Sequence, residues 1–172
     1  MQGGKPNLIW IFENCLLPEL KAMSPTNDTG CFTDFKGNVF LAECRPDNME
    51  KVNSEFRDTA LLCWLDLIAD SRTVPGGYIG DGRQHWGLHI YFIGGVKADR
   101  NIQIATATSA EDHKRVMRKN PARDQVGSTA ANTWGINSTL VEPYRMIWDL
   151  IDQGIGKWDC TWCIDYSTPT TG

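Results

Sequence analysis

Two cationic residues close together, Lys97 and Arg100, are well suited by type and spacing to hold an anion. They lie in the segment 94–100, Gly-Gly-Val-Lys-Ala-Asp-Arg, between two short runs of alternating apolar residues. Two strands joined by a glycine-containing loop are typical of a β-hairpin, so both cations are expected on its turn. There they could bind the phosphates of a ligand. The alternative is a solvated turn, in which Asp99 partly neutralises the two cations.

A different chemistry is suggested by Cys15, which follows an apolar run and lies at the expected start of a short helix. A thiol in that position ionises more readily, and with His85 or His89 as its base it would form a cysteine hydrolase. The pair Cys160 and Cys163 could contribute to a metal site, although no second pair stands at zinc-site spacing. The alternative for this pair is that it occupies the two faces of a C-terminal strand.

Seven tryptophans in 172 residues give the chain many large aromatic side chains. Three of them lie near apolar stripes and are expected to anchor the core, because tryptophan buries a large area: Trp64, Trp86 and Trp148. Aromatic side chains at the rims of loops can stack on flat bases, while nearby arginine or lysine binds phosphates. The tryptophans left open for that role are Trp10, Trp134, Trp158 and Trp162.

The apolar pattern predicts an α+β fold with a curved, mainly antiparallel sheet and helices packed on one face. Compact or alternating apolar runs predict strands over 7–13, 38–44, 86–93 and 101–107, and a C-terminal strand over 157–166. The strands over 86–93 and 101–107 are expected to pair with each other. Helical spacing predicts three helices, over 48–69, 109–119 and about 140–153. The expected core residues are Phe56, Cys63, Leu67, Leu88, Ile90, Ile104 and Ile147.

Length and composition limit the class of protein. The 172 residues fit one domain, expected over 1–166 and followed by a disordered tail over 167–172. The formal charge of −4 argues against a protein that coats nucleic acid non-specifically, because such binding requires many cations. No apolar run in the sequence approaches the roughly 20 residues that span a bilayer. A cytoplasmic protein whose six cysteines are mostly free thiols is therefore expected.

Four segments, taken in order, resemble parts of the mRNA cap-binding subunit of the eukaryotic translation initiation complex. The segments Leu8–Asn14, Asp58–Leu65, Arg115–Lys119 and Gly127–Asn132 are similar to that family's opening strand, long helix, next helix and flexible loop. The resemblance covers about half of the chain. It fails after Asn14, where the family has a stacking tryptophan and then its first long helix.

The resemblance implies a protein that binds a nucleotide or an mRNA cap. Phe32 falls near one of the family's stacking tryptophans, and Asp34 falls near the acid that reads the guanine edge. Lys97 and Arg100 match the cations that hold the phosphates of the cap. The expected partner is therefore capped RNA or a nucleotide, or else a protein, with no cofactor and no metal. The third alternative is an interaction module without a ligand pocket, because no decisive catalytic motif is present in the sequence.

Overall fold

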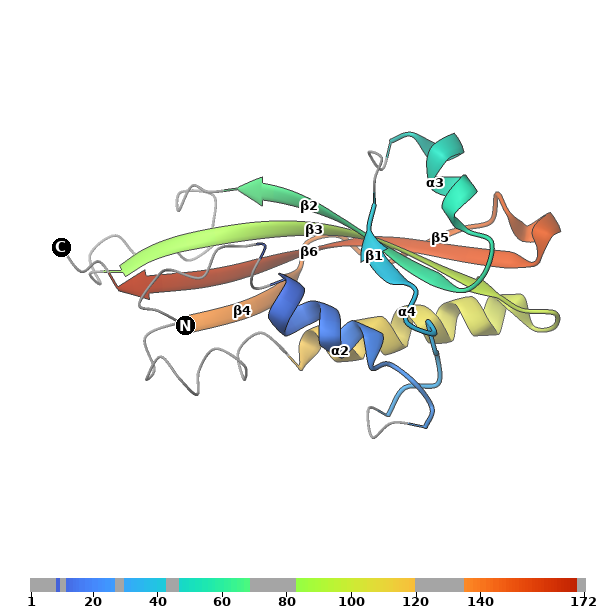
Figure 1. Ribbon diagram of the computed structural model, residues 1–172, viewed down its shortest axis with the longest axis horizontal. Coiled ribbons are helices and arrows are strands. Elements are labelled where there is room, and N and C mark those ends of the chain that lie inside the picture. The colour runs from blue at the N-terminus through green and yellow to red at the C-terminus, as the bar shows by residue number, and fades with distance from the viewer. Residues whose placement is uncertain are drawn as a thin grey trace.

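The computed structural model describes residues 9, 12–26, 30–42, 47–68, 83–119 and 135–169. These residues form an α+β fold around one mixed, mainly antiparallel sheet of six strands (Figure 1), which confirms the predicted fold class. The sheet order is β1-β2-β3-β6-β4, and β5 also pairs with β6; only β1 and β2 are parallel. The strands are β1 Val39–Leu41, β2 Ala60–Ile68, β3 Arg83–Lys97, β4 Gly135–Leu140, β5 Arg145–Ile147 and β6 Ile155–Pro169.

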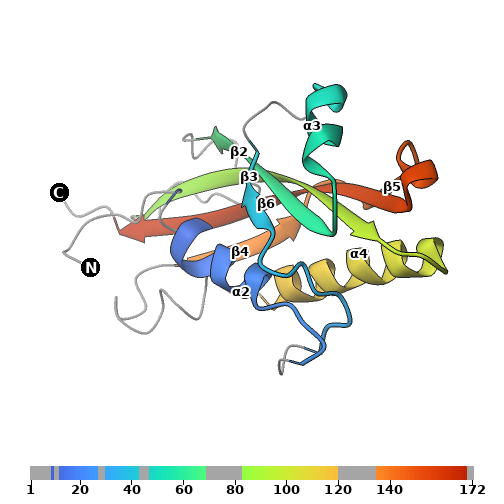
Figure 2. The same cartoon turned by 45° about the vertical axis from the view of Figure 1, so that its right-hand side comes forward.

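The helical segments pack on both faces of this sheet, rather than on one face alone as predicted, because apolar side chains alternate to both sides of its central strands. These segments are η1 Phe12–Leu16, α2 Leu17–Lys21, α3 Met49–Glu55, α4 Ile102–Arg118 and the single turn η3 Ile151–Gln153. The helices α2 and α4 cover one face, called here the α4 face (Figures 1 and 2). The short helix α3 packs at one end of the opposite face, called here the α3 face.

The core has two parts, one on each face of the sheet. Alternate residues of the two fifteen-residue strands β3 and β6 contribute to the larger part, on the α4 face. Its members include Phe12, Leu16, Leu61, Cys63, Leu88, Ile90, Phe92, Met117, Trp158 and Trp162. The smaller part, beneath α3, consists of Val52, Phe56, Ala60, Leu62, Ile93, Leu150 and Ile155. Of the predicted core residues, Phe56, Cys63, Leu88 and Ile90 are confirmed as buried.

The predicted pairing of strand 86–93 with a strand over 101–107 is wrong. The first of these strands is present and extends as β3 to Lys97, where it pairs with β2 and β6 instead. The second segment is helical. It forms the first part of α4, which also includes all but the last residue of the predicted helix 109–119. The two glycines of the expected turn therefore lie inside a strand.

The buried side of α4 explains this error. It is largely small and polar, since Thr106, Ser109 and His113 are buried at helical spacing. Ser109 Oγ accepts a hydrogen bond from Trp158 Nε1 at 3.0 Å, so its polar group is satisfied inside the protein. A pattern based on apolar periodicity does not detect such a stripe. Ile104, predicted in the core, lies on the outer side of the helix and is 67% exposed.

The predicted helix over 48–69 is wrong in its second half, where the chain forms β2. Leu61 and Cys63 are buried on the α4 face, whereas Ala60 and Leu62 are buried on the α3 face. A strand that is buried on both faces is apolar throughout, so its sequence resembles that of a buried helix. The apolar spacing that predicts one long helix therefore comes from a short helix followed by a strand.

The strand predicted over 7–13 is wrong where the structure describes it. Ile9 is helical, and η1 begins at Phe12. Phe12, Leu16 and Leu20 are all buried, at intervals of four residues. This spacing places them on one side of a helical segment, and it becomes visible only when the residues after the apolar run are included.

The helix predicted over about 140–153 is also wrong. This segment contains the end of β4, the strand β5 and the turn η3. The Val141 N–H donates a hydrogen bond to the Thr161 carbonyl oxygen at 2.9 Å, and β5 continues the pairing with β6. The backbone N–H and C=O groups of this segment thus form hydrogen bonds with the edge of β6, whereas in a helix they would bond to one another. Ile147, predicted in the core, is half-buried.

The tryptophans also differ from their predicted roles. Trp158 and Trp162 are buried in the core of the α4 face rather than exposed at a loop rim. Trp148, predicted as a core anchor, is exposed, and Trp64 is half-buried. The side chain of Trp86 lies outside the described residues.

The remaining predicted elements lie partly beyond the described residues. β1 falls within the predicted strand 38–44, whose last two residues are not described. The predicted strand 157–166 is confirmed as part of β6, which continues to Pro169 and so enters the predicted tail 167–172. The side chain of Leu67 lies outside the description. Among the described helices, none combines the length and the apolar character needed to cross a membrane.

Candidate functional site

A cavity of about 570 Å³ opens between α3, the end of β3 and the loop that precedes β6. Its floor is apolar and consists of Phe56, Leu150 and Ile155, which are all buried. Its rim is polar and includes two exposed cations, Arg57 and Lys97. The other lining residues are Glu50, Asn53, Ser54 and Gln153. Its volume lies in the range of roughly 300–1,000 Å³ that is typical of small-molecule sites, and six of its nine described lining residues are polar or charged.

The short helix α3 is positioned at both of its ends. At its start, Asn48 Oδ1 accepts a hydrogen bond from the Lys51 N–H at 3.3 Å, which caps the helix. At its end, the ring of Phe56 lies over Gly95 of β3, where an added Cβ would come within 2.4 Å of the ring. Gly95 is therefore needed for this close approach, which places the following residue, Arg57, at the rim of the cavity.

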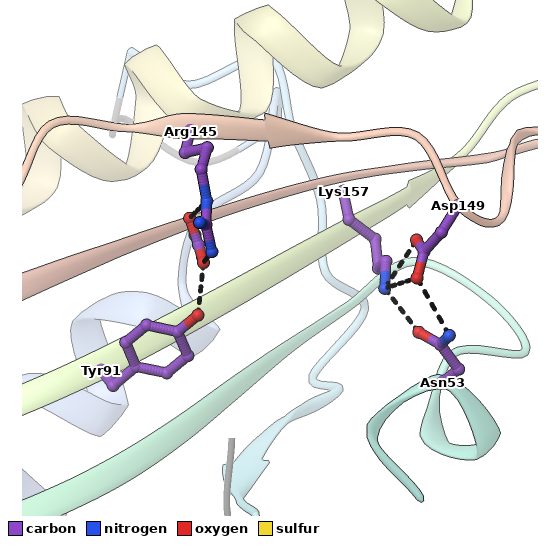
Figure 3. A network of polar contacts seen from close by, with 6 residues as sticks. Asn53, Tyr91, Arg145, Asp149 and Lys157 are labelled. Carbon is purple, nitrogen blue, oxygen red and sulfur yellow. Dashed lines mark hydrogen bonds and ion pairs between the residues drawn. The ribbon is translucent and has the colours of Figure 1, made fainter. Parts of the chain in front are cut away.

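Lys157, which is fully buried on β6, joins α3 to the loop before β6 (Figure 3). Its Nζ donates a hydrogen bond to Asn53 Oδ1 and lies 2.9 Å from Asp149 Oδ1. Asn53 Nδ2 donates to Asp149 Oδ2 at 3.0 Å, so the three residues form a closed network. Partial burial alone would raise the pKa of Asp149, but the hydrogen bonds from Lys157 and Asn53 hold this pKa below its ordinary value. The network stabilises the wall of the cavity.

A second polar network lies beside the first on the α3 face and connects β3, β5 and β6 (Figure 3). Arg145 donates to both carboxylate oxygens of Asp159, with Nη2 at 2.6 Å and Nε at 3.1 Å. The Tyr91 hydroxyl donates to the same carboxylate. Burial, together with the hydrogen bond to Asp159, raises the pKa of Tyr91. Because both oxygens of Asp159 are engaged, this network positions strands and offers no free base.

The structure separates the four residues predicted to form one site. Lys97 lines the cavity, whereas Arg100 lies in the linker between β3 and α4 and is not among the lining residues. Phe32 and Asp34 belong to the segment between α2 and β1, which runs beside α4 (Figure 2). The Phe32 N–H donates to Asp112 Oδ2 of α4 at 2.8 Å. Lys97 is thus the one of these four residues in the described lining of the cavity beside α3.

Arg57 is a lining residue that the sequence does not point to, because a helix over 48–69 would place it in the helix interior. The polar run Arg57-Asp58-Thr59 between apolar residues is the signal that marks the end of α3. Thr59 Oγ1 accepts a hydrogen bond from the Lys97 N–H at 3.1 Å. This contact ties the end of β3 to the segment that carries Arg57, and it places both cations at one rim.

The thiol proposed as a nucleophile is not placed for catalysis. Cys15 is buried in the core of the α4 face, and burial raises the pKa of its thiol to about 11. A reactive thiol requires a lowered pKa. His89 lies between Leu88 and Ile90, which face α4, so the alternation of the strand directs His89 to the opposite face. The structure therefore does not bring Cys15 and His89 together, and the side chain of His85 lies outside the described residues.

The cysteine pair of β6 occupies two faces of the strand. Cys160 is a buried free thiol in the core of the α4 face, and Cys163, three residues further on, has the opposite orientation in the strand. Cys15 and Cys63 are also buried free thiols. Within the described ranges, no group of three or more His, Cys, Asp or Glu side chains is arranged to hold a metal ion.

The sequence matches no protein-family model, and comparison with curated proteins gives no match. The resemblance to the cap-binding subunit therefore stays a prediction. Among the described residues, the cavity beside α3 is the feature with the most direct chemical meaning.

Proposed function

We propose that the protein binds a nucleotide, free or at the capped end of an RNA, in the cavity beside α3. The observation that carries this proposal is the presence of two exposed cations and an apolar floor in one cavity. A nucleotide has complementary parts, because its phosphates are anionic and its base is flat, with apolar faces and a polar edge.

The phosphates would lie at the rim, beside Arg57 and Lys97. A guanidinium can donate two parallel hydrogen bonds to phosphate oxygens, and an ammonium group adds a compact positive charge. Among the described lining residues, these two cations outnumber the one acid, Glu50, in a chain whose net charge is −4. The local excess of positive charge favours an anionic ligand over a neutral one of similar size.

The base would lie against the floor of Phe56, Leu150 and Ile155. Burial of one apolar face of the base would provide affinity, while the hydroxyl of Ser54 and the amide of Gln153 could form hydrogen bonds to its edge. This arrangement replaces the stacking on Phe32 that the family resemblance implies. A free nucleotide and a capped RNA end both fit it, since each presents a base joined to a chain of phosphates.

The proposal is tested by isothermal titration calorimetry with a capped dinucleotide, its uncapped counterpart and a plain nucleoside triphosphate. Lys97→Glu and Arg57→Glu should each weaken binding by about tenfold or more, because each change replaces attraction of the phosphates with repulsion. Arg100→Glu is the matched control, since Arg100 is an exposed cation three residues from Lys97 that does not line the cavity. It should leave the affinity unchanged.

Circular dichroism should show that all three variants retain the fold, because the three side chains are exposed. A nucleoside without phosphates should bind the wild type and the two cavity variants with equal, lower affinity. An absence of binding by every nucleotide at millimolar concentration would contradict the proposal. An equal loss in Arg100→Glu would instead favour the cation pair on the 94–100 segment that the sequence predicts.

A further inference from the structure

The outer side of α4 carries a second group of cations. Lys114, Arg115, Arg118 and Lys119, together with Glu111, line a depression of about 300 Å³. Residues spaced three or four apart stand on one side of a helix, so these side chains form one continuous patch. Four cations against one acid in this patch contrast with the net charge of −4 for the whole chain.

An exposed aromatic residue lies on a segment that is anchored to α4 beside this patch. Phe32 is 73% exposed, more than any other large hydrophobic side chain among the described residues. Its backbone is anchored by Asp112, whose Oδ2 accepts hydrogen bonds from the N–H groups of Phe32 and Thr33, each at 2.8 Å. Arg115 Nη1 lies 3.5 Å from Asp112 Oδ1 and donates a hydrogen bond to the Gly30 carbonyl oxygen. One buried carboxylate thus holds the aromatic residue and a guanidinium together.

We propose that Phe32 and the cationic side of α4 form a binding surface for single-stranded nucleic acid. A single exposed hydrophobic residue is ordinary and carries no meaning alone. An exposed aromatic residue on a segment anchored beside a row of cations is an arrangement by which proteins bind single strands without sequence preference. This surface shares no lining residue with the cavity beside α3, so the inference does not depend on the proposed nucleotide site.

The residues of this surface have distinct roles. Phe32 stacks on a base, and the exposed cations Arg118 and Lys119 bind successive phosphates. Arg115 contributes the part of its guanidinium that remains accessible, since its side chain is 45% exposed. Lys114 contributes less, because its Nζ lies 3.7 Å from a carboxylate oxygen of Glu111.

The test is the fluorescence anisotropy of a labelled single-stranded RNA of about eight nucleotides with a 5′-hydroxyl end, and of DNA with the same sequence. Phe32→Ala should lower the affinity about tenfold, whereas Phe32→Tyr should retain it, because a phenol ring still stacks. Arg118→Glu combined with Lys119→Glu should lower the affinity by at least as much and should reduce its dependence on salt. Lys51→Glu, which changes an exposed lysine of α3, is the control and should have no effect.

Cross-tests separate this inference from the proposed function. Lys97→Glu and Arg57→Glu should leave binding of the oligonucleotide unchanged, and Phe32→Ala should leave binding of the mononucleotide unchanged. Equal affinity for RNA and DNA supports recognition of base faces and phosphates, and a preference for RNA supports the same surface with added contacts to the 2′-hydroxyl. The inference is overturned by an absence of binding at low salt or by equal binding of wild type and Phe32→Ala. It is also overturned if a polyglutamate peptide displaces the RNA as effectively as unlabelled RNA does, which would indicate an acidic protein partner.

Discussion

The cavity beside α3 and the surface on α4 are each held in place by one buried charge, but the two charges have opposite signs. In the cavity wall, the amine of Lys157 joins α3 to the loop before β6 through Asn53 and Asp149. On α4, the carboxylate of Asp112 fixes the segment that carries Phe32. Both charged side chains are almost completely buried, whereas their partners differ in chemistry and in access to water.

This difference in partners decides how much each region depends on its buried charge. Asp149, the charged partner of Lys157, has a side chain that is 38% exposed, so water can solvate it if the pair is broken. The partners of Asp112 include two backbone N–H groups, which have fixed directions and lose their acceptor when the carboxylate is removed. We therefore expect the α4 surface to be more sensitive to loss of its buried charge than the cavity is.

The largest effect is expected from Asp112→Ala. The change removes the acceptor of two N–H groups and the partner of Arg115, so the free energy of unfolding should fall by about 3 kcal/mol. Urea denaturation measures this loss. Oligonucleotide binding should also be lost, because Phe32 is no longer held beside α4, while nucleotide binding in the cavity should persist. Asp112→Asn keeps one acceptor oxygen, so its free energy of unfolding should fall less. A fall below about half a kcal/mol in Asp112→Ala would show that the segment around Phe32 is held in another way.

A smaller effect is expected from Lys157→Met, which keeps most of the side-chain volume. Removing one partner of a fully buried pair costs roughly 3–5 kcal/mol, and the exposure of Asp149 should reduce this cost to about 2 kcal/mol. Nucleotide binding should weaken because α3 loses a contact with β6, whereas oligonucleotide binding should not change. Adding Asp149→Asn should recover part of the lost stability, because it removes the unpaired charge. No recovery in this double variant, again measured in urea, would argue against electrostatic coupling of the two side chains.

The elements that the sequence predicts correctly are those with a strong local pattern. The strand over 86–93 and the second half of α4 carry their own alternation or capping signals, and both are present. The errors occur where the pattern depends on distant parts of the chain. β2 is apolar on both sides because the sheet is covered on both faces, and β4 and β5 are strands because the long edge of β6 is available to them.

The candidate sites follow the same division. Lys97 can be selected from sequence because it is a cation near the end of an apolar strand. Its neighbour in space, Arg57, can be recognised only when the position of the end of α3 is known. Asp112 looks like an ordinary surface acid of a helix, and its burial becomes clear only when the segment around Phe32 is placed on α4. Lys157 likewise reads as the polar member of an alternating strand. Residue type alone therefore identifies exposed charged groups more readily than the buried ones that hold the fold.

An effect that separates the two regions in a single protein is expected from pH. On α4, burial lowers the pKa of His113 to about 3, its Nδ1 lies 2.6 Å from the Tyr144 hydroxyl oxygen, and its Nε2 has no hydrogen-bond partner among the described residues.

The unfolded chain binds a proton at this histidine below its ordinary pKa of 6.5, whereas the folded chain does not until about 3. This histidine therefore does not lower the free energy of unfolding above pH 6.5. Below that pH, the free energy of unfolding should fall by about 1.4 kcal/mol per pH unit. The folded pKa of Asp149 lies below its ordinary 3.8, so the contribution of the cavity network is present above that pH and is lost only as the pH falls below it.

At about pH 5 the free energy needed to open α4 and expose His113 should thus be lower than at neutral pH, while the network beside α3 is unaffected. Urea denaturation at several pH values between neutrality and this point measures the slope, and hydrogen exchange should show earlier opening of α4 than of α3. His113→Phe preserves an aromatic ring against Phe92 and Trp158 but cannot titrate, so it should remove this part of the slope. Asp149→Asn should leave the slope in this range unchanged. If His113→Phe and the wild type lose stability in parallel, the acid sensitivity comes from other groups and the two regions do not separate by pH.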